Sequence, residues 1–396
     1  MRDDEPVTDV FDAGFAANPW PTLARLRAEG GVHRVRTPDG PPAWLVTRYG
    51  DVRAGLLDDR LSTDIHRAGP EDYRGFAVPP SLLAFLLADP VEHARLRHFV
   101  TSELSPRRLS EWSHRAPILV DSFLRELDSG AEIDLVERLA VPLPAAVLGE
   151  LLGLEAAERE TLLGWATSTL LPSADPPRAR DTLTTMLAII TATTEQGRAT
   201  RADTLLGRLV AAHDDTGSPS ADELAGLLFY LLFVWYEVLV DLIAGSVLTL
   251  LGRPDQLRIL RDTTEKPSAV DELLRYLSPQ VLAGPRFATT DLTIGGQTIH
   301  AGQTVLLCLA SANRDPEIFD RPDELDLARA PHAQLGLGYG LHACLGNALV
   351  RTLTATALDH IFTRWPGTTL TVDERDIAWR SGFRHRGPFT LPVKLG

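Results

Sequence analysis

The long apolar run from Leu227 to Leu251 sets the strongest limit on how this chain can fold. A helix of this length can cross a bilayer. Glu237 and Asp241 stand in the middle of the run, however, and charged side chains are costly at the centre of a membrane. The run therefore predicts a buried helix in the core of a soluble protein.

Length and charge narrow the class of protein further. A chain of 396 residues with 44% hydrophobic residues can bury a large core. Its net charge of -14 disfavours nucleic acid or an anionic membrane as a partner, and a small molecule or a basic protein fits better. The first residues, MRDDEPVTDVFDAGF, lack the basic-then-apolar order of a signal peptide, and Cys308 and Cys344 lack the spacing of a disulfide framework or a zinc site. We therefore expect a cytoplasmic protein that is not exported.

The N-terminal part predicts a helix that leads into a hairpin. Apolar residues have helical spacing over residues 20–30, where the pattern ends at a glycine. Two alternating runs, 32–36 and 43–47, then flank a Pro-Asp-Gly turn.

The middle of the chain is helical in period, and short strand-like runs follow it. The helical region covers about residues 94–251. Its breaks stand at residues 105–106, 142, 172–177 and 216–220, and the strand-like runs are residues 292–298, 304–309 and 389–394. No repeat or long linker separates the chain into halves. We expect one domain over residues 1–396, mainly α with small β-sheets (an α+β fold).

The segment around Cys344 carries the strongest chemical signal. Residues 335–351 read LGLGYGLHACLGNALVR, in which four glycines surround one cysteine and an apolar helical run follows. Glycines permit a tight backbone path that aims N–H groups at a sulfur, and a helix after the sulfur favours the thiolate. The alternative is an ordinary buried cysteine at the start of a helix.

This segment resembles the haem-binding loop of the cytochromes P450, whose pattern is aromatic-Gly-x-Gly-x-His-x-Cys-x-Gly. The residues that match are Gly338, Gly340, His342, Cys344 and Gly346. Leu337 replaces the usual phenylalanine. The resemblance implies a cytochrome P450-like fold with a long central helix over haem b (iron protoporphyrin IX), and it implies that Cys344 is the ligand of the iron.

A second segment, DPVEHARLR, resembles the family helix that holds the haem propionates. His93 and Arg97 take those roles by this resemblance, and Arg286 and His342 are similar to the remaining propionate ligands. Residues i and i+4 share a helix face, so His93 and Arg97 can reach the same pair of carboxylates. The alternative is a basic solvated helix, to which we expect Arg95 to belong.

A third segment, DELLRY, resembles the Glu-x-x-Arg helix that braces the haem-binding loop in the family. Glu272 and Arg275 are three residues apart and can pair on one helix face, although an ordinary surface pair has the same spacing. Relatives complete this pair with an arginine where RPDELDL has Glu324. Either Arg321 or Arg329 substitutes for it, or the brace is weaker.

The central helix departs from the family pattern. Relatives carry Ala-Gly-x-Asp/Glu-Thr, whose acid and alcohol deliver protons during dioxygen activation. The aligned residues here are Val234, Trp235, Tyr236, Glu237 and Val238. Glu237 keeps the acid and is the candidate catalytic residue, but Val238 cannot form the hydrogen bond of a threonine. Glu237 could instead cap a buried polar cluster, and the two aromatic residues could be core or pocket wall.

The opening of the chain resembles that of actinomycete members of the family that oxidise macrolides and other polyketides. In such enzymes the segments at about residues 64–89 and 168–201 shape the substrate mouth. Their apolar residues here are Phe76, Leu82, Leu83, Phe85, Leu170, Leu171 and Met186, which fit a hydrophobic substrate or an ordinary core.

Three functions follow from the resemblance. The first is a haem-thiolate monooxygenase that tailors a polyketide or another secondary metabolite with electrons from ferredoxin and ferredoxin reductase. The second is an atypical haem-thiolate enzyme that uses peroxide or catalyses a rearrangement or cyclisation, which Trp235 and Val238 motivate. The third is a non-catalytic accessory of a biosynthetic pathway, against which the retention of Cys344 argues.

Overall fold

The folded chain divides into two compact units, and each unit combines three separate segments of the sequence. The computed structural model describes residues 7–74, 78–88, 90–101, 106–173, 179–200, 204–263, 266–330, 333–380 and 383–396. The first unit comprises Met1–Ala77, Ser268–Cys344 and Trp379–Gly387, and the second comprises Val78–Pro267, Leu345–Ala378 and Pro388–Gly396. The mainly α fold with small sheets is confirmed. That residues 1–396 form a single domain stays a prediction.

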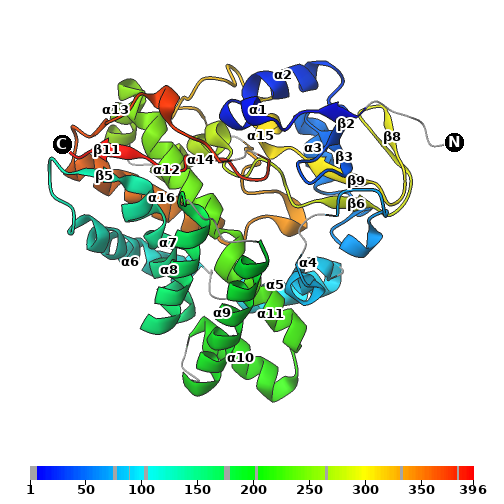
Figure 1. Cartoon of the computed structure of the whole chain (residues 1–396), viewed down its shortest axis with the longest axis horizontal. Coiled ribbons are helices and arrows are strands. Elements are labelled where there is room, and N and C mark those ends of the chain that lie inside the picture. The colour runs from blue at the N-terminus through cyan, green and yellow to red at the C-terminus, as the bar shows by residue number, and fades with distance from the viewer. Residues whose placement is uncertain are drawn as a thin grey trace. The chain divides into compact units, whose positions relative to one another are not determined.

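The first unit contains most of the β structure. Its six-stranded sheet has the order β1-β2-β3-β9-β6-β4, and β7 and β8 form a separate pair (Figure 1). The strands are β1 (Thr8–Asp9), β2 (Val32–Arg36), β3 (Pro42–Val46), β4 (Leu61–Ser62), β6 (Arg286–Ala288), β7 (Leu292–Ile294), β8 (Gln297–Ile299) and β9 (Thr304–Leu307). The helices are α1 (Ala13–Ala17), α2 (Trp20–Ala28), α3 (Tyr49–Gly55), α14 (Lys266–Leu277), α15 (Leu309–Ala312), η1 (Ile65–Arg67) and η5 (Gly340–His342).

The predicted N-terminal hairpin is confirmed, whereas one predicted strand is wrong. Strands β2 and β3 pair antiparallel with Val32 opposite Val46, close to the predicted runs. The run at residues 292–298 is two strands rather than one, because Gly295 and Gly296 turn the chain with φ angles of 54° and 84°. A two-residue turn with positive φ at both positions suits a tight hairpin, and glycine adopts it without strain.

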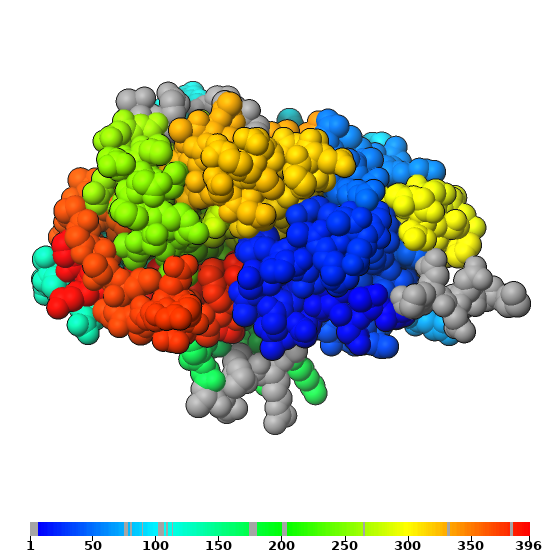
Figure 2. Space-filling model, turned by 90° about the horizontal axis from the view of Figure 1, so that it is seen from above, coloured from blue at the N-terminus to red at the C-terminus, as the bar shows by residue number. Residues whose placement is uncertain are grey.

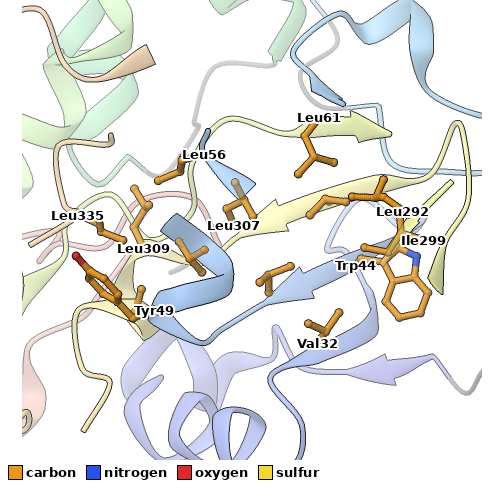
Figure 3. Close-up of a cluster of buried hydrophobic side chains, with 14 of the residues drawn as sticks. Val32, Trp44, Tyr49, Leu56, Leu61, Leu292, Ile299, Leu307, Leu309 and Leu335 are labelled. Atoms are coloured by element: carbon orange, nitrogen blue, oxygen red, sulfur yellow. The ribbon is translucent and has the colours of Figure 1, made fainter. Parts of the chain in front are cut away.

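The core of the first unit joins segments that are distant in the sequence. Figure 2 shows the blue N-terminal residues beside yellow-orange residues from beyond residue 300. A buried hydrogen bond joins these segments, in which Arg27 Nη1 donates to the carbonyl of Ser311 over 3.1 Å. Figure 3 shows part of the buried cluster, in which Leu335 lies beside Leu309 and Tyr49. Leu335 begins the glycine-rich segment, so that segment starts from a fixed point in the core.

The second unit contains most of the helices. They are η2 (Pro80–Leu83), α4 (Ala84–Leu87), α5 (Pro90–Thr101), α6 (Pro106–Leu124), η3 (Val136–Ala140), α7 (Pro142–Leu152), α8 (Ala156–Leu170), α9 (Ala179–Thr200), α10 (Leu205–Thr216), α11 (Ala221–Phe229), η4 (Tyr230–Val234), α12 (Tyr236–Leu251), α13 (Pro254–Asp262), α16 (Asn347–Arg364) and η6 (Glu374–Asp376). Its three-stranded sheet has the order β10-β11-β5, formed by β10 (Thr369–Leu370), β11 (Pro392–Lys394) and β5 (Glu132–Asp134). The helical pattern did not predict β5.

The long apolar run is a core helix, as predicted. The helix from Ala221 to Leu251 is apolar enough to cross a membrane, but 67% of its most apolar window is buried within the protein. Such burial is typical of the core helix of a soluble protein. The helix begins after the predicted break at residues 216–220 with a capping box, in which Ser220 and Glu223 each accept a main-chain N–H of the other.

Candidate functional site

The predicted site residues are divided between the two units. Arg286, His342 and Cys344 belong to the first unit. His93, Arg97 and Glu237 belong to the second.

In the first unit, the segment before Cys344 is a closed loop. The Cys344 main-chain N–H donates to the carbonyl of Leu337 over 2.8 Å, and the Ala343 N–H donates to the carbonyl of Gly340 over 3.0 Å. Gly338 and Gly340 both have a φ of 73°, in the left-handed region that favours glycine. The two glycines of the motif are thus required by the backbone path that returns Cys344 to Leu337.

The same loop is anchored to the rest of the first unit. The Leu335 N–H donates to Asn313 Oδ1 over 2.7 Å, and Leu335 itself is 1% exposed in the core cluster. A Cβ on Gly336 would lie 3.2 Å from the carbonyl oxygen of Leu274 in α14, a contact tighter than nine in ten real Cβ contacts. The loop therefore rests directly on the backbone of α14, the helix that carries Glu272 and Arg275.

The brace on α14 is complete, and its third member is Arg329. Arg275 and Glu272 form a bidentate pair, with Nε to Oε2 at 2.7 Å and Nη2 to Oε1 at 2.8 Å. Arg329 Nε also donates to Glu272 Oε1, over 3.2 Å. Arg321 instead pairs with Glu324 on the surface, over 2.9 Å. Of the alternatives left open by the sequence, substitution by Arg329 is the one that the structure contains.

Arg286 and His342 lie on different elements of the first unit. Arg286 is 4% exposed in β6, and its Nη1 donates to the carbonyl of Gly284 over 3.0 Å. His342 is partly exposed and ends η5, two residues before Cys344. Both side chains carry donors that suit a carboxylate.

In the second unit, His93 and Arg97 lie on α5 at the predicted spacing of one helical turn. His93 is 1% exposed and Arg97 is partly exposed. The ring of Phe85 stacks on His93 with centroids 4.5 Å apart and an interplanar angle of 25°, and Tyr230 meets Phe85 edge to face at 5.3 Å. Aromatic contacts of this kind restrict the orientation of the imidazole. This stack was not predictable from the sequence, because it depends on how α4 packs on α5.

Arg95, which the sequence assigned to a solvated face, is 34% exposed and also makes three side-chain hydrogen bonds. Its guanidinium donates to Glu92 Oε2 over 2.7 Å, to Ser218 Oγ over 2.8 Å and to Glu223 Oε1 over 2.5 Å. Glu223 is also the acidic residue of the capping box that starts α11. Arg95 therefore ties α5 to the beginning of the central helix, and the sequence did not predict this tie because Ser218 and Glu223 lie 123 and 128 residues away.

Glu237 lies where the central helix leaves one face uncovered. It stands in the first turn of α12 and is partly exposed. The other partly or fully exposed residues of this stretch are Tyr230, Leu231, Val234, Trp235 and Val238. Helical periodicity puts all six on one side, which we call the open face, whereas the intervening Leu232, Phe233, Tyr236 and Leu239 are buried. The open face offers one carboxylate among mainly apolar groups, which suits a hydrophobic ligand with a polar reacting centre.

The predicted mouth residues are mostly core residues. Leu82, Leu83, Phe85 and Leu170 are all buried, with exposed fractions of 1% to 7%. Leu171 and Met186 are partly exposed. Phe76, together with the ends of both predicted segments at residues 89 and 201, lies outside the described residues.

Each unit, taken by itself, carries side chains whose chemistry suits part of a haem. A haem iron would need at least one ligand from the protein, such as a thiolate. Cys344, on its closed glycine loop, has the chemistry of that ligand, and Arg97 and Arg286 have the chemistry to bind carboxylates. Among the described residues there is no group of three or more His, Cys, Asp or Glu side chains that could hold a metal ion.

Comparisons with known proteins find relatives along the whole chain. The family model described as Cytochrome P450 matches residues 267–377, which contain the brace and the Cys344 loop. The chain is 36% identical over 390 residues to a vitamin D(3) 25-hydroxylase of Pseudonocardia autotrophica, covering 98% of this chain and 96% of that protein. It is 35% identical to a 6-deoxyerythronolide B hydroxylase of Saccharopolyspora erythraea, with coverage of 98% and 99%.

Among solved structures, the chain is similar to the P450 monooxygenase TamI in complex with tirandamycin C. The two superpose with a TM-score of 0.90 at 35% sequence identity, over 99% of this chain and 100% of that one. The similarity thus extends over both units and is not limited to the loop at Cys344.

Proposed function

The chain belongs to the cytochrome P450 family, and we propose that it is a haem-thiolate monooxygenase that tailors a polyketide or a similar secondary metabolite. It is an oxidoreductase, and its cofactor is haem, iron protoporphyrin IX. The observation on which the proposal rests is the closed loop in which the Cys344 N–H meets the Leu337 carbonyl.

Cys344 is the proposed ligand of the iron, and His93, Arg97, Arg286 and His342 are the proposed ligands of the propionates. Bound haem supplies the iron at which dioxygen is activated. The thiolate of Cys344 would hold the iron and would donate electron density to it. The four cationic or hydrogen-bonding side chains offset the two negative charges of the propionates.

Glu237 is the proposed proton donor. Glu237 stands in the first turn of α12 and on the open face, where its carboxyl group could exchange a proton with a bound substrate or water. Val238 follows it without a hydroxyl, so a hydroxyl of the substrate or an ordered water has to complete the proton path. The same valine favours a second candidate function, an atypical reaction driven by peroxide.

The substrate and the partners are inferred from the family and from the open face. Actinomycete relatives of this chain include polyketide-tailoring enzymes, and the open face carries the apolar side chains of Leu231, Val234 and Val238. We propose that a ferredoxin and a ferredoxin reductase supply the electrons and that the enzyme is cytoplasmic.

Spectroscopy and turnover test the proposed function together. The purified protein is expected to contain haem, and macrolide polyketides are expected to shift its spin state at lower concentrations than a linear fatty acid does. Turnover should need ferredoxin, reductase and NADPH. Protein without haem would overturn the proposal, and equal product formation with peroxide alone would favour the second candidate.

Replacing Val238 by threonine tests the incomplete proton path. We expect Val238→Thr to raise, several-fold, the amount of product formed per NADPH consumed with a substrate that lacks a hydroxyl near its reacting carbon. The two side chains are nearly isosteric, so the change adds a hydrogen-bonding group with little change in volume. The measurement is product against NADPH at saturating substrate.

Val372→Thr is the control for the chemical change, because Val372 is an exposed valine outside the open face. It should leave the ratio of product to NADPH close to that of the unaltered protein. An unchanged ratio in Val238→Thr would place the proton path elsewhere.

A further inference from the structure

The central helix changes its hydrogen-bonding pattern immediately before Glu237. Helix α11 ends at Phe229, residues Tyr230–Val234 form a π turn, and α12 begins at Tyr236. A π turn shifts the bonding by one residue and leaves carbonyl groups displaced from their usual partners. Glu237 owes its position in a first helical turn to this break.

Trp235 bonds to the displaced backbone through its side chain. In an uninterrupted α-helix the carbonyl of Leu231 would accept the main-chain N–H of Trp235. Here the main-chain N–H of Trp235 goes to the carbonyl of Phe233 instead. The indole Nε1–H of Trp235 donates to the Leu231 carbonyl over 2.7 Å. The indole N–H of Trp235 thus replaces the main-chain N–H of the same residue as the donor to the Leu231 carbonyl.

Tyr236 fixes the other side of the break. Its hydroxyl donates to the carbonyl of Val141 over 2.6 Å, and the residue is fully buried. Burial raises the pKa of this hydroxyl well above its usual range, so the group keeps its proton and remains a donor. Trp165 packs its ring edge to face against both Tyr236, at 5.7 Å, and Phe233, at 4.7 Å. The segment before Glu237 is therefore held from two directions.

We propose that Trp235 is a positioning residue for Glu237, because its indole N–H holds the helix break that puts the carboxylate in the first turn of α12. A displaced carbonyl otherwise bonds to water, which leaves the turn free to exchange between hydrogen-bonding patterns. The glycine that relatives carry at this position has no side chain that could do this. The inference rests on the proposed role of Glu237 as proton donor.

Trp235→Phe tests the inference, because it keeps an aromatic ring and removes the N–H. In the haem-loaded protein we expect main-chain amides around residues 231–239 to exchange with deuterium at least about fivefold faster, the effect of losing roughly one hydrogen bond, here the one to the partly buried Leu231 carbonyl. We also expect product per NADPH to fall at least about twofold. Haem content should not change.

Trp165→Phe is the matched control. Trp165 lies in the same aromatic cluster, but its Nε1 has no hydrogen-bond partner among the described residues. Removal of that N–H should leave amide exchange at residues 231–239 unchanged. Equal exchange in Trp235→Phe and the unaltered protein would overturn the proposal. Faster exchange with unchanged product per NADPH would also overturn it, since Trp235 would then support the helix without positioning the acid.

A second pair of variants keeps the test decisive if the phenylalanine variant folds poorly. Trp235→Gln retains N–H donors and Trp235→Leu does not, although the two side chains have similar size. The main-chain amides of residues 231–239 should exchange with deuterium more slowly in the glutamine variant than in the leucine variant. Equal exchange rates in the two variants would count against the proposal. Glu237→Gln separates the two hypotheses: if it leaves product per NADPH unchanged, the proposed role of Glu237 is wrong whatever Trp235 does.

Discussion

Cys344→Ala is expected to abolish the red-shifted Soret band of the reduced carbon monoxide adduct, and with it NADPH-driven turnover. The band reports a thiolate on the iron, and alanine offers no ligand. Cys344→His should retain more haem than Cys344→Ala, because imidazole also binds haem iron, but it should show the band of a nitrogen ligand. The measurement is the difference spectrum of reduced protein with and without carbon monoxide, normalised to haem content.

The other cysteine of the chain is the matched control. Cys308 is fully buried in the core of the first unit, and burial raises the pKa of its thiol to about 12. A thiol that stays protonated is a poor metal ligand. Cys308→Ala should therefore keep the thiolate band. Loss of the band in Cys308→Ala, or its survival in Cys344→Ala, would show that Cys344 is not the ligand of the iron.

The sequence predicted those features of the site that depend on short spacings. The glycine pattern around Cys344 predicted a tight backbone path, and Gly338 and Gly340 both adopt a left-handed conformation there that favours glycine. The pairing of Glu272 with Arg275 likewise follows from a separation of three residues on one helix.

Features that depend on contacts between distant segments were not predictable in the same way. Arg329 reaches Glu272 from a loop 57 residues away, so the sequence left it as one of several alternatives. The partners of Arg95 and the indole bond of Trp235 depend on a turn and a helix break whose positions are set by packing. Local pattern cannot specify such contacts, because side-chain reach and backbone path are decided together in the folded protein.

The brace on α14 should show the largest effect on stability. Arg275 has no exposed surface and uses all five of its N–H donors. Its acceptors are the two carboxylate oxygens of Glu272 and the carbonyls of Asn313, Pro322 and Glu324. Arg275→Leu would leave the Glu272 carboxylate buried with Arg329 as its remaining cationic partner. Removal of one partner from a buried pair costs about 3–5 kcal/mol, so we expect a loss of that size in urea unfolding.

The effect should extend to the Cys344 loop. Arg275 bonds to the carbonyl of Asn313, and the side chain of Asn313 accepts the N–H of Leu335, at the start of the loop. Arg275→Leu is therefore expected to release haem faster to an acceptor protein, in addition to unfolding at lower urea. Arg275→Lys should behave almost as badly, because one ammonium group has three donors and cannot reproduce the planar fork.

Arg321→Leu is the control from the same part of the chain. Arg321 is 57% exposed and pairs with Asp320 and Glu324 on the surface, where such pairs contribute about 1 kcal/mol or less. This variant should unfold and release haem nearly as the unaltered protein does. The double variant Glu272→Leu/Arg275→Leu should recover part of the stability lost in Arg275→Leu, because it removes the buried charge as well. If the double variant recovers nothing, the three carbonyls dominate the cost, and the arginine acts mainly as a clamp on the backbone that leads to Cys344.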